Sequence, residues 1–170
     1  MKPKDKDRGL TAEMLRMLVL YDPVTGEFYW RESGIGRPKM GERAGWKAQG
    51  RWFMQLPGWR SGFLCSRLAW LYMIGEWPTH RIDHENQNKS DDRWENLREA
   101  TNSQNKANIG RRSHNTSGVT GVSRVNGGWL ARCKIDNKIV LQKWFKTKGE
   151  AVAARQQAVQ RHHGEFAAKQ

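Results

Sequence analysis

The sequence predicts an α+β protein in two parts, the second a three-stranded antiparallel sheet packed on one helix. Three observations support this prediction. Short apolar runs alternate with turn residues through the first hundred positions. A basic stretch over 110–117 is typical of a linker. Three strand-like runs and one Ala-rich run follow it. We therefore expect domains at 1–109 and 118–170.

The N-terminal part begins with an amphipathic run. Residues 11–20 predict a short helix capped by Thr11. Residues 21–30 predict two strands around an Asp-Pro-x-x-Gly turn. The elements expected next are two strands and a buried helix, at 51–55, 62–64 and 67–74. Gly75 provides the stop signal for that helix.

Tryptophan is unusually frequent in this part of the chain. Six of the nine Trp lie at positions 30, 46, 52, 59, 70 and 77. Such large side chains either build a small core or stack on nucleic-acid bases. We interpret them as core residues.

The C-terminal part predicts strands at 119–125, 129–135 and 138–145. Thr147 and Glu150 form a capping box, which starts a helix reaching His163 before Gly164. Alternation along the middle strand directs Trp129, Ala131, Cys133 and Ile135 to the helix and Leu130, Arg132 and Lys134 to solvent. We expect Arg124 and Lys143 to join the solvent face.

Charge indicates a polyanionic partner. The chain has 30 Lys and Arg against 17 Asp and Glu, a net charge of +13. Residues 106–170 hold thirteen basic and three acidic side chains, which gives +10 of that total. Nucleic acid is the partner we expect, ahead of an anionic membrane.

Other functional classes are disfavoured by composition. The sequence contains no apolar run long enough for a membrane span and no apolar signal-peptide core at its start. Two cysteines are too few for a cysteine-based zinc site. We expect a cytoplasmic protein, in the bacterial host cytoplasm if it is phage-encoded.

Four polar residues form a candidate site. Asp83 and His84 end a short alternating run, Asn96 follows thirteen residues after Asp83, and Asn105 nine residues later. A strand, a loop, a second strand at 97–100 and a helix would bring all four together. Taken singly, an Asp-His pair is often a surface turn, and Asn-rich loops often make caps.

The chemistry of this set is specific. One carboxylate and one amide oxygen can hold a hard divalent cation and leave positions for water and phosphate. A neighbouring imidazole can deprotonate the attacking water. A second amide can accept the other imidazole N–H and fix its tautomer.

The run from Ile82 to Asn105 closely resembles the HNH motif of phage and intron homing endonucleases. The matching residues are Ile82-Asp83-His84-x-Asn86, Asp92-Arg93-x-x-Asn96-Leu97-Arg98-x-Ala100-Thr101 and Gln104-Asn105. Residues 21–30 and 67–78 are similar to the N-terminal part of phage HNH proteins. The resemblance implies a ββα-metal fold over the motif at 80–109 and hydrolysis of a DNA phosphodiester.

Roles follow by position in that family. The resemblance implies that Asp83 and Asn105 bind one Mg²⁺ or Mn²⁺, that His84 is the general base and that Asn96 orients His84. Relatives commonly have Asp-Asn-Arg where this chain has Asp91-Asp92-Arg93, an apolar residue at 85 and a Gly at 87, and many carry a His at 66, where this chain has Ser. Glu85 and Asp92 therefore add negative charge near the DNA path.

Two arginines of the motif have two possible roles. Arg93 and Arg98 are candidates for contact with DNA phosphate. Either residue could equally be a structural ion-pair partner.

The run from Ser117 to Ala167 resembles the Apetala/ethylene-response-factor type of DNA-binding domain, which implies that the sheet binds DNA. Candidate DNA-binding residues on it are Arg124, Arg132, Lys134 and Lys143. The third strand has one residue more than that family usually has, and a bulge there would redirect Lys143 and Trp144. The alternative is a solvated basic face without a partner.

Together these observations and resemblances predict a metal-dependent, site-selective DNA endonuclease of homing type, with double-stranded DNA as its partner. It would leave 5′-phosphate and 3′-hydroxyl ends and act as a monomer that nicks or a homodimer that cuts both strands. The alternative is a non-cutting DNA-binding or regulatory protein on a degenerate nuclease scaffold. An RNA-binding protein is the third interpretation.

Overall fold

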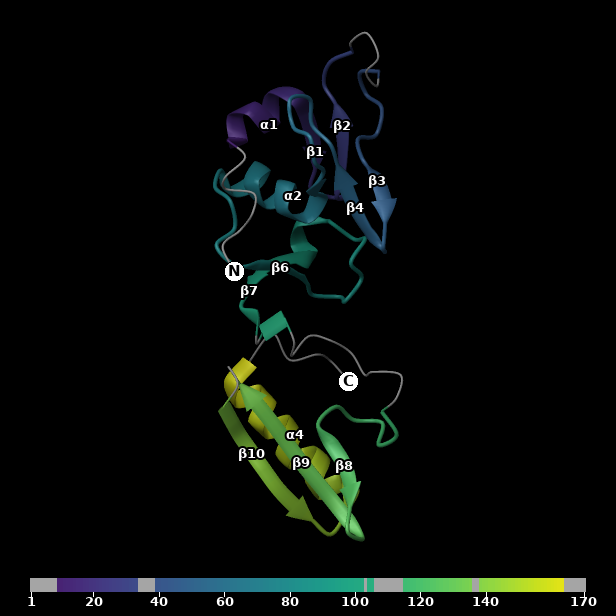
Figure 1. Cartoon of the computed structure of the whole chain (residues 1–170), viewed down its shortest axis with the longest axis vertical. Helices are drawn as coiled ribbons and strands as arrows, with labels where there is room; N and C mark the ends of the chain where they lie inside the picture. Colours follow the sequence, from purple (N-terminus) through teal and green to yellow (C-terminus); the bar gives the residue numbers. More distant parts are fainter. Residues whose placement is uncertain (1–8, 34–38, 103, 106–114, 136–137, 164–170) are drawn as a thin grey trace. The chain divides into compact units, whose positions relative to one another are not determined.

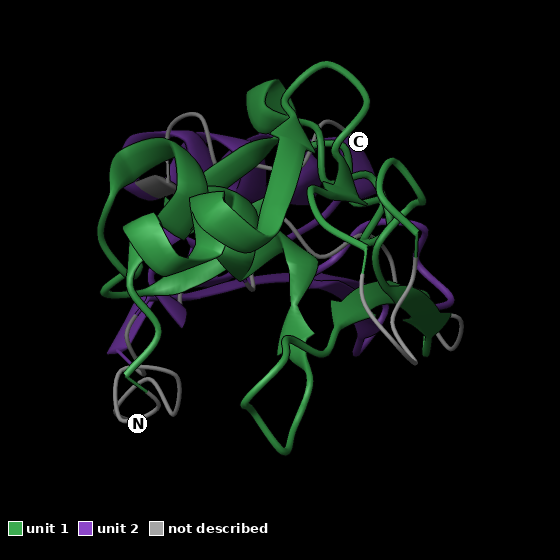
Figure 2. Cartoon of the chain, turned by 90° about the horizontal axis from the view of Figure 1, so that it is seen from above, with its two compact units in different colours: residues 1–99 green, residues 100–170 purple. Residues whose placement is uncertain are grey.

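The computed structural model describes residues 9–33, 39–102, 104–105, 115–135 and 138–163 (Figure 1). The chain divides into two compact units, residues 1–99 and residues 100–170 (Figure 2). Both contain helices and small sheets, so the predicted α+β class is confirmed. Most of the predicted linker at 110–117 lies outside the described residues.

The first unit opens with helix α1 (Ala12–Leu18). The predicted cap is confirmed, because the Oγ1 of Thr11 accepts a hydrogen bond from the Met14 N–H at 3.2 Å. The helix ends two residues earlier than we predicted. At Val19 the backbone becomes extended and strand β1 begins, which buries this β-branched side chain in the core.

Strands β1 (Val19–Asp22) and β2 (Glu27–Trp30) form the predicted antiparallel pair, with Asp22 opposite Glu27. A second sheet has the strand order β3-β4-β5, formed by Trp46–Ala48, Arg51–Met54 and Phe63–Leu64. Helix α2 (Cys65–Ile74) follows directly. It ends at Gly75 in the left-handed conformation, as the sequence predicted.

The core of the first unit lies between α1, α2 and the two sheets. Leu15, Phe28, Met54, Phe63 and Leu68 are among its fully buried side chains. Six tryptophans pack against this core, at positions 30, 52, 59, 70, 77 and 94. The core interpretation is wrong for Trp46, whose side chain is 45% exposed.

The candidate site is built on a small sheet of two strands, β6 (Arg81–His84) and β7 (Leu97–Ala100). A loop joins them and ends in the 3₁₀ turn η2 (Trp94–Asn96). The Glu85 N–H donates to the Asn96 carbonyl at 3.0 Å, which closes the base of this loop.

The β1–β2 turn supports that loop. The Tyr21 hydroxyl donates to the Asp92 carbonyl at 2.7 Å, and the Trp94 N–H donates to the Pro23 carbonyl at 3.0 Å. Gly26 has a φ of +75° and lies directly against the backbone of Asp92 and Arg93. A side chain at Gly26 would collide with that backbone.

The second unit contains a sheet of strand order β10-β9-β8. These strands are Lys138–Phe145, Gly128–Ile135 and Val122–Val125, and helix α4 is Lys148–His163. The predicted capping box is present, since Thr147 and Glu150 exchange side-chain and backbone hydrogen bonds at 3.0 and 3.3 Å. Ala151 of α4 is buried in one cluster with Val122 and Ala131. The predicted end of the helix at Gly164 lies outside the described residues.

The alternation predicted for the middle strand is confirmed. Ala131 and Cys133 are buried, whereas Arg132 and Lys134 are exposed. We call the side of this sheet that carries Arg132 and Lys134 the open face.

The placement of Arg124 and Lys143 on the open face is wrong. Directly opposed residues of antiparallel strands share a face. Arg124 lies opposite Trp129, and Lys143 lies opposite the buried Ala131. Both cations are therefore on the helix side of the sheet.

A β-bulge determines this result for β10. The register shifts between Ile139 and Leu141, so β10 has one residue more here than its partner strand β9. Beyond the shift, Gln142 lies opposite Arg132 and Trp144 opposite Leu130. The predicted bulge in the third strand is confirmed, and it lies before Lys143 and Trp144, the residues that we expected it to redirect.

Within the ranges given above, no helix combines the length and the apolar character required to cross a membrane.

The contact at Gly26 yields a stability prediction. Gly26→Ala should lower the free energy of unfolding by about 2–4 kcal/mol, because it adds overpacking to left-handed strain. Gly50→Ala is the matched control, since Gly50 has a similar φ of +70° with open space around it. Urea denaturation of both variants measures the difference. Equal losses would show that the close approach contributes nothing.

Candidate active site

Strand β6 places two buried polar side chains next to each other. Asp83 and His84 are only 5% and 4% exposed, although both are ionisable. Neighbours on a strand point to opposite faces. Each must therefore find its partner on a different side, because a buried polar group without one is costly.

His84 pairs with a carboxylate of the loop. Its Nε2 lies 2.8 Å from Oδ1 of Asp92, and both side chains are buried. An ionised carboxylate can only accept a hydrogen bond, so Nε2 then carries the proton. The lone pair of the neutral ring is consequently on Nδ1, and this nitrogen is the one that can act as a base.

The Asp92 carboxylate is buried. Burial raises the pKa of the Asp92 carboxyl above its ordinary value, while the hydrogen bond from His84 and the charge of Arg51 oppose this rise. Burial likewise raises the pKa of Tyr21, so its hydroxyl remains a donor to the Asp92 carbonyl. Asp92 is the site residue that sequence reasoning missed. The available signal was an acid in a place where relatives commonly have Asn.

Asp83 pairs across the sheet with Arg98 of β7. The Nε of Arg98 lies 3.1 Å from Oδ2 of Asp83, and Nη1 lies 4.0 Å from Glu85. The Arg98 side chain is itself largely buried. Of its two expected roles, the structure shows the ion pair, and phosphate contact stays a prediction.

Asn96 closes the loop around the site. Its Oδ1 accepts from the Asn86 N–H at 2.9 Å, and its Nδ2 donates to the Asp91 carbonyl at 2.7 Å. The first hydrogen bond joins the two ends of the β6–β7 loop, and the second ties its end to its middle. We predicted that Asn96 orients His84 directly. The hydrogen bonds of Asn96 shape the loop that carries Asp92, and its orientation of His84 stays a prediction.

Arg93 is also engaged within the loop. Its Nε and Nη2 contact the two carboxylate oxygens of Asp91, each at 2.8 Å, and its Nη1 contacts Glu95 at 3.1 Å. The Arg93 guanidinium lowers the pKa of Asp91 to about 2. The structural ion pair is therefore present, and contact of Arg93 with DNA stays a prediction.

Asn105 belongs to the second unit. Its N–H donates to the Thr101 carbonyl at 2.9 Å, which forms one helical turn. Thr101 and Gln104 exchange hydrogen bonds at 2.8 and 3.3 Å, a capping box that starts this turn. The structure thus brings Asp83, His84 and Asn96 together in the first unit, while Asn105 lies beyond the division.

The donor chemistry suits a hard cation. Among the described residues, no group of three or more His, Cys, Asp or Glu could hold a metal ion. The expected ligands are one carboxylate, Asp83, and one amide, Asn105. Two oxygen donors fit Mg²⁺ or Mn²⁺, which retain waters and take the remaining ligands from phosphate.

Residues 63–107 match the family model of HNH endonucleases. The matched segment runs from β5 and α2 through β6 and β7 to the turn that contains Asn105. It supports an HNH nuclease that acts on DNA. No curated protein and no solved structure matches the chain. The resemblance of residues 117–167 to a second DNA-binding family lies outside the matched segment and stays a prediction.

The hydrogen bond between His84 and Asp92 yields a prediction for cleavage. Asp92→Ala should lower the single-turnover cleavage rate by about 10- to 100-fold, because His84 loses the acceptor that fixes its tautomer. Asp92→Asn should restore most of the rate, since its amide oxygen still accepts from Nε2. Rates on a plasmid substrate, with melting curves for folding, measure both. An unchanged rate in Asp92→Ala would contradict the role.

Asp92→Asn should also affect stability. The pKa of Asp92 is raised in the folded state, so its contribution to stability falls as the pH rises above about 4. The melting temperature of Asp92→Asn relative to the unchanged protein should therefore increase from about pH 4 to pH 7.

Proposed function

We propose that this protein is a metal-dependent DNA endonuclease in which His84 activates the attacking water. The observation that carries the proposal is the buried His84–Asp92 pair at 2.8 Å, next to Asp83, within the segment that matches the HNH model. When Asp92 is ionised, this pair fixes which imidazole nitrogen carries the lone pair, and a defined lone pair is what general-base hydrolysis requires.

The proposed core is of the ββα-metal type. Strands β6 and β7 and the capped turn from Thr101 follow one another in the order that this arrangement needs. Asp83 and Asn105 would hold one Mg²⁺ or Mn²⁺. When bound, such an ion stabilises negative charge on the phosphate and on the leaving oxygen.

The chain's own residues prepare the reaction. Asp92 holds the proton on Nε2, so Nδ1 of His84 takes the proton from water. Arg98 forms an ion pair with the buried Asp83 carboxylate and compensates its charge. Attack in line with the leaving 3′ oxygen then yields 5′-phosphate and 3′-hydroxyl ends.

The second unit is proposed to hold the DNA. Its open face carries the exposed Arg132 and Lys134, and between them and the β8–β9 turn lies the exposed indole of Trp144. The Trp144 Nε1 donates to the Val125 carbonyl at 3.1 Å, so the ring crosses β9 at Gly128. Cations and a flat aromatic ring on one surface suit contact with phosphate and sugar.

This arrangement supports a homing-type enzyme in which one unit cuts and the other selects the site. One active site cuts one strand in each encounter. A monomer would therefore nick, and a homodimer would break both strands. A non-cutting DNA-binding protein is the alternative that the following experiment decides.

Conversion of supercoiled plasmid in Mg²⁺, Mn²⁺ or EDTA tests the proposal. His84→Ala should lower the cleavage rate by about 10²- to 10⁴-fold, because the general base is lost. His80→Ala is the matched control, since His80 is exposed on the same segment and should be dispensable. Metal-dependent nicked circles from the unchanged protein and His80→Ala would support the enzyme. Tight binding without cleavage of target-containing DNA would support the alternative.

The open face is tested by two double variants with equal loss of charge. Arg132→Ala with Lys134→Ala should weaken DNA binding and reduce the slope of log K against log salt by up to about 2. Arg124→Ala with Lys143→Ala removes two cations from the helix side and should have a clearly smaller effect. Fluorescence anisotropy over a salt series measures both slopes. Equal slopes for the two pairs would exclude the open face as the DNA surface.

A further inference from the structure

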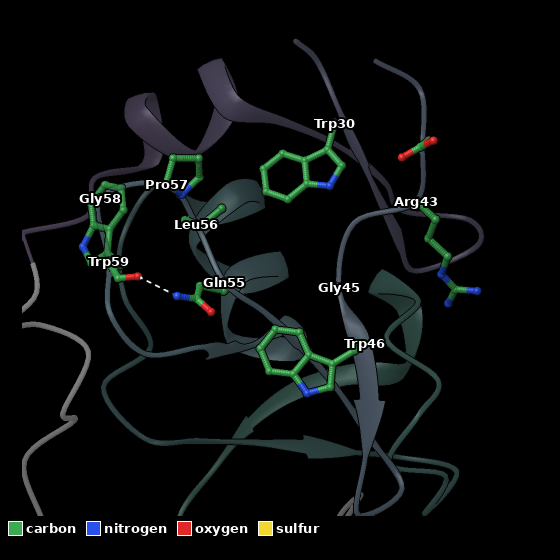
Figure 3. Close-up of a pocket in the computed structure, with 10 residues that line it drawn as sticks. Trp30, Arg43, Gly45, Trp46, Gln55, Leu56, Pro57, Gly58 and Trp59 are labelled. Atoms are coloured by element: carbon green, nitrogen blue, oxygen red, sulfur yellow. Dashed lines mark hydrogen bonds between the residues drawn. The ribbon is translucent and has the colours of Figure 1, made fainter. Parts of the chain in front are cut away.

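A cleft in the first unit is lined by tryptophan side chains (Figure 3). It has a volume of about 640 Å³, and Trp30, Trp46 and Trp59 are among its walls. In Figure 3 the indoles of Trp30 and Trp46 lie above and below Leu56 and Gln55 in the view. The volume falls in the range of about 300–1,000 Å³ that is common for small-molecule sites.

Trp46 is held in place although it is 45% exposed. Its ring stacks on Phe53, with centroids 6.1 Å apart and an interplanar angle of 23°. The edge of the same ring lies against Gly62, where a side chain would collide with it. A rigid, exposed indole loses little conformational freedom when a planar ligand stacks on it.

Polar groups at the cleft are also fixed. The Nε2 of Gln55 donates to the Trp59 carbonyl at 3.2 Å, which orients an amide able to hydrogen-bond a base edge. The Arg43 guanidinium stacks 3.7 Å from the ring centre of Trp52 and pairs with Glu27 at 2.8 Å. These contacts fix the orientation of both polar groups.

The charged side chains that line the cleft are Glu42 and Arg43, and further cations follow close by in the chain. Residues 39–62 contain five basic side chains and one acidic one, Glu42. The Glu42 carboxylate already accepts a hydrogen bond from the Lys39 N–H at 3.0 Å. Lys47 and Arg60 are exposed, and they directly follow Trp46 and Trp59 in the sequence. Aromatic walls with exposed cations next to them in the chain are a feature of sites for unpaired nucleotides.

We propose that this cleft binds an unpaired base of the DNA substrate. The proposal rests on DNA being the substrate, but it requires no cleavage. A paired base offers its faces only to its stacked neighbours, whereas an unpaired base can enter between indole rings. The first unit would thus recognise strand distortion, separately from the duplex contact of the second unit.

Binding of three labelled hairpin duplexes to the full chain in EDTA tests this site. One duplex is fully paired, one has a bulged thymine, and one has a bulged abasic residue at the same place. The unchanged protein should bind the bulged thymine at least about fivefold more tightly than the other two, the low end of one base–aromatic stack. Equal affinity for all three would overturn the proposal. A preference shared by the abasic bulge would also overturn it, because the base would then not be recognised.

Variants of Trp46 locate the effect. Trp46→Ala should abolish the preference for the bulged thymine, while Trp46→Phe should keep part of it. Trp144→Ala is the matched control, with 46% exposure, and should change binding of all three duplexes by one factor. Melting curves establish that each variant is folded. A preference that persists in folded Trp46→Ala would overturn the assignment.

The outcome of this binding test can be distinguished from the outcome of the plasmid-cleavage test of the proposed function. Failure of the nuclease proposal would appear as absent plasmid cleavage with metal. Failure of the present inference would appear only as loss of discrimination among the three duplexes.

Discussion

The backbone of Asp92 and Arg93 packs against Gly26, and the candidate site depends on this contact. A turn between β1 and β2 without a side chain lets the β6–β7 loop approach closely. Tyr21 and Pro23 add a hydrogen bond each from the same hairpin. The Asp92 carboxylate is thereby fixed where it meets His84. A hairpin far from the site in sequence thus positions the carboxylate that pairs with His84.

Burial and charge are balanced in pairs around strand β6. Two neighbouring residues are both almost inaccessible, and each has an oppositely charged or hydrogen-bonding partner on its own face of the sheet. An unpaired charge at either position would cost several kcal/mol, about 3–5 for a broken buried pair. The pairing therefore stabilises the strand, and an ionised Asp92 accepts the hydrogen on Nε2 of His84.

Each of the two units carries an exposed tryptophan. In the second unit, the extra residue in β10 turns Lys143 toward the helix side and leaves Trp144 on the open face. In the first unit, Trp46 is exposed at a cleft rather than buried with the other tryptophans. Each unit therefore presents one exposed indole in a basic environment. We infer that one meets duplex DNA and that the other meets an unpaired base.

Local signals in the sequence determined the elements of this protein. The caps at Thr11 and Thr147, the stop at Gly75 and the bounds of β10 follow from residues close in the chain, so they were predictable. The residues of the motif were predictable for the same reason, since their order and spacing carry the family signal.

Only the tertiary structure decided how these elements use their side chains. The Asp92–His84 pair depends on a loop docked by a distant hairpin, and the facing of Arg124 and Lys143 depends on strand register. Sequence spacing gives the alternation within a strand, but the contact with neighbouring strands fixes which face is open. The exposure of Trp46 likewise depends on packing against Phe53, which no local pattern specifies.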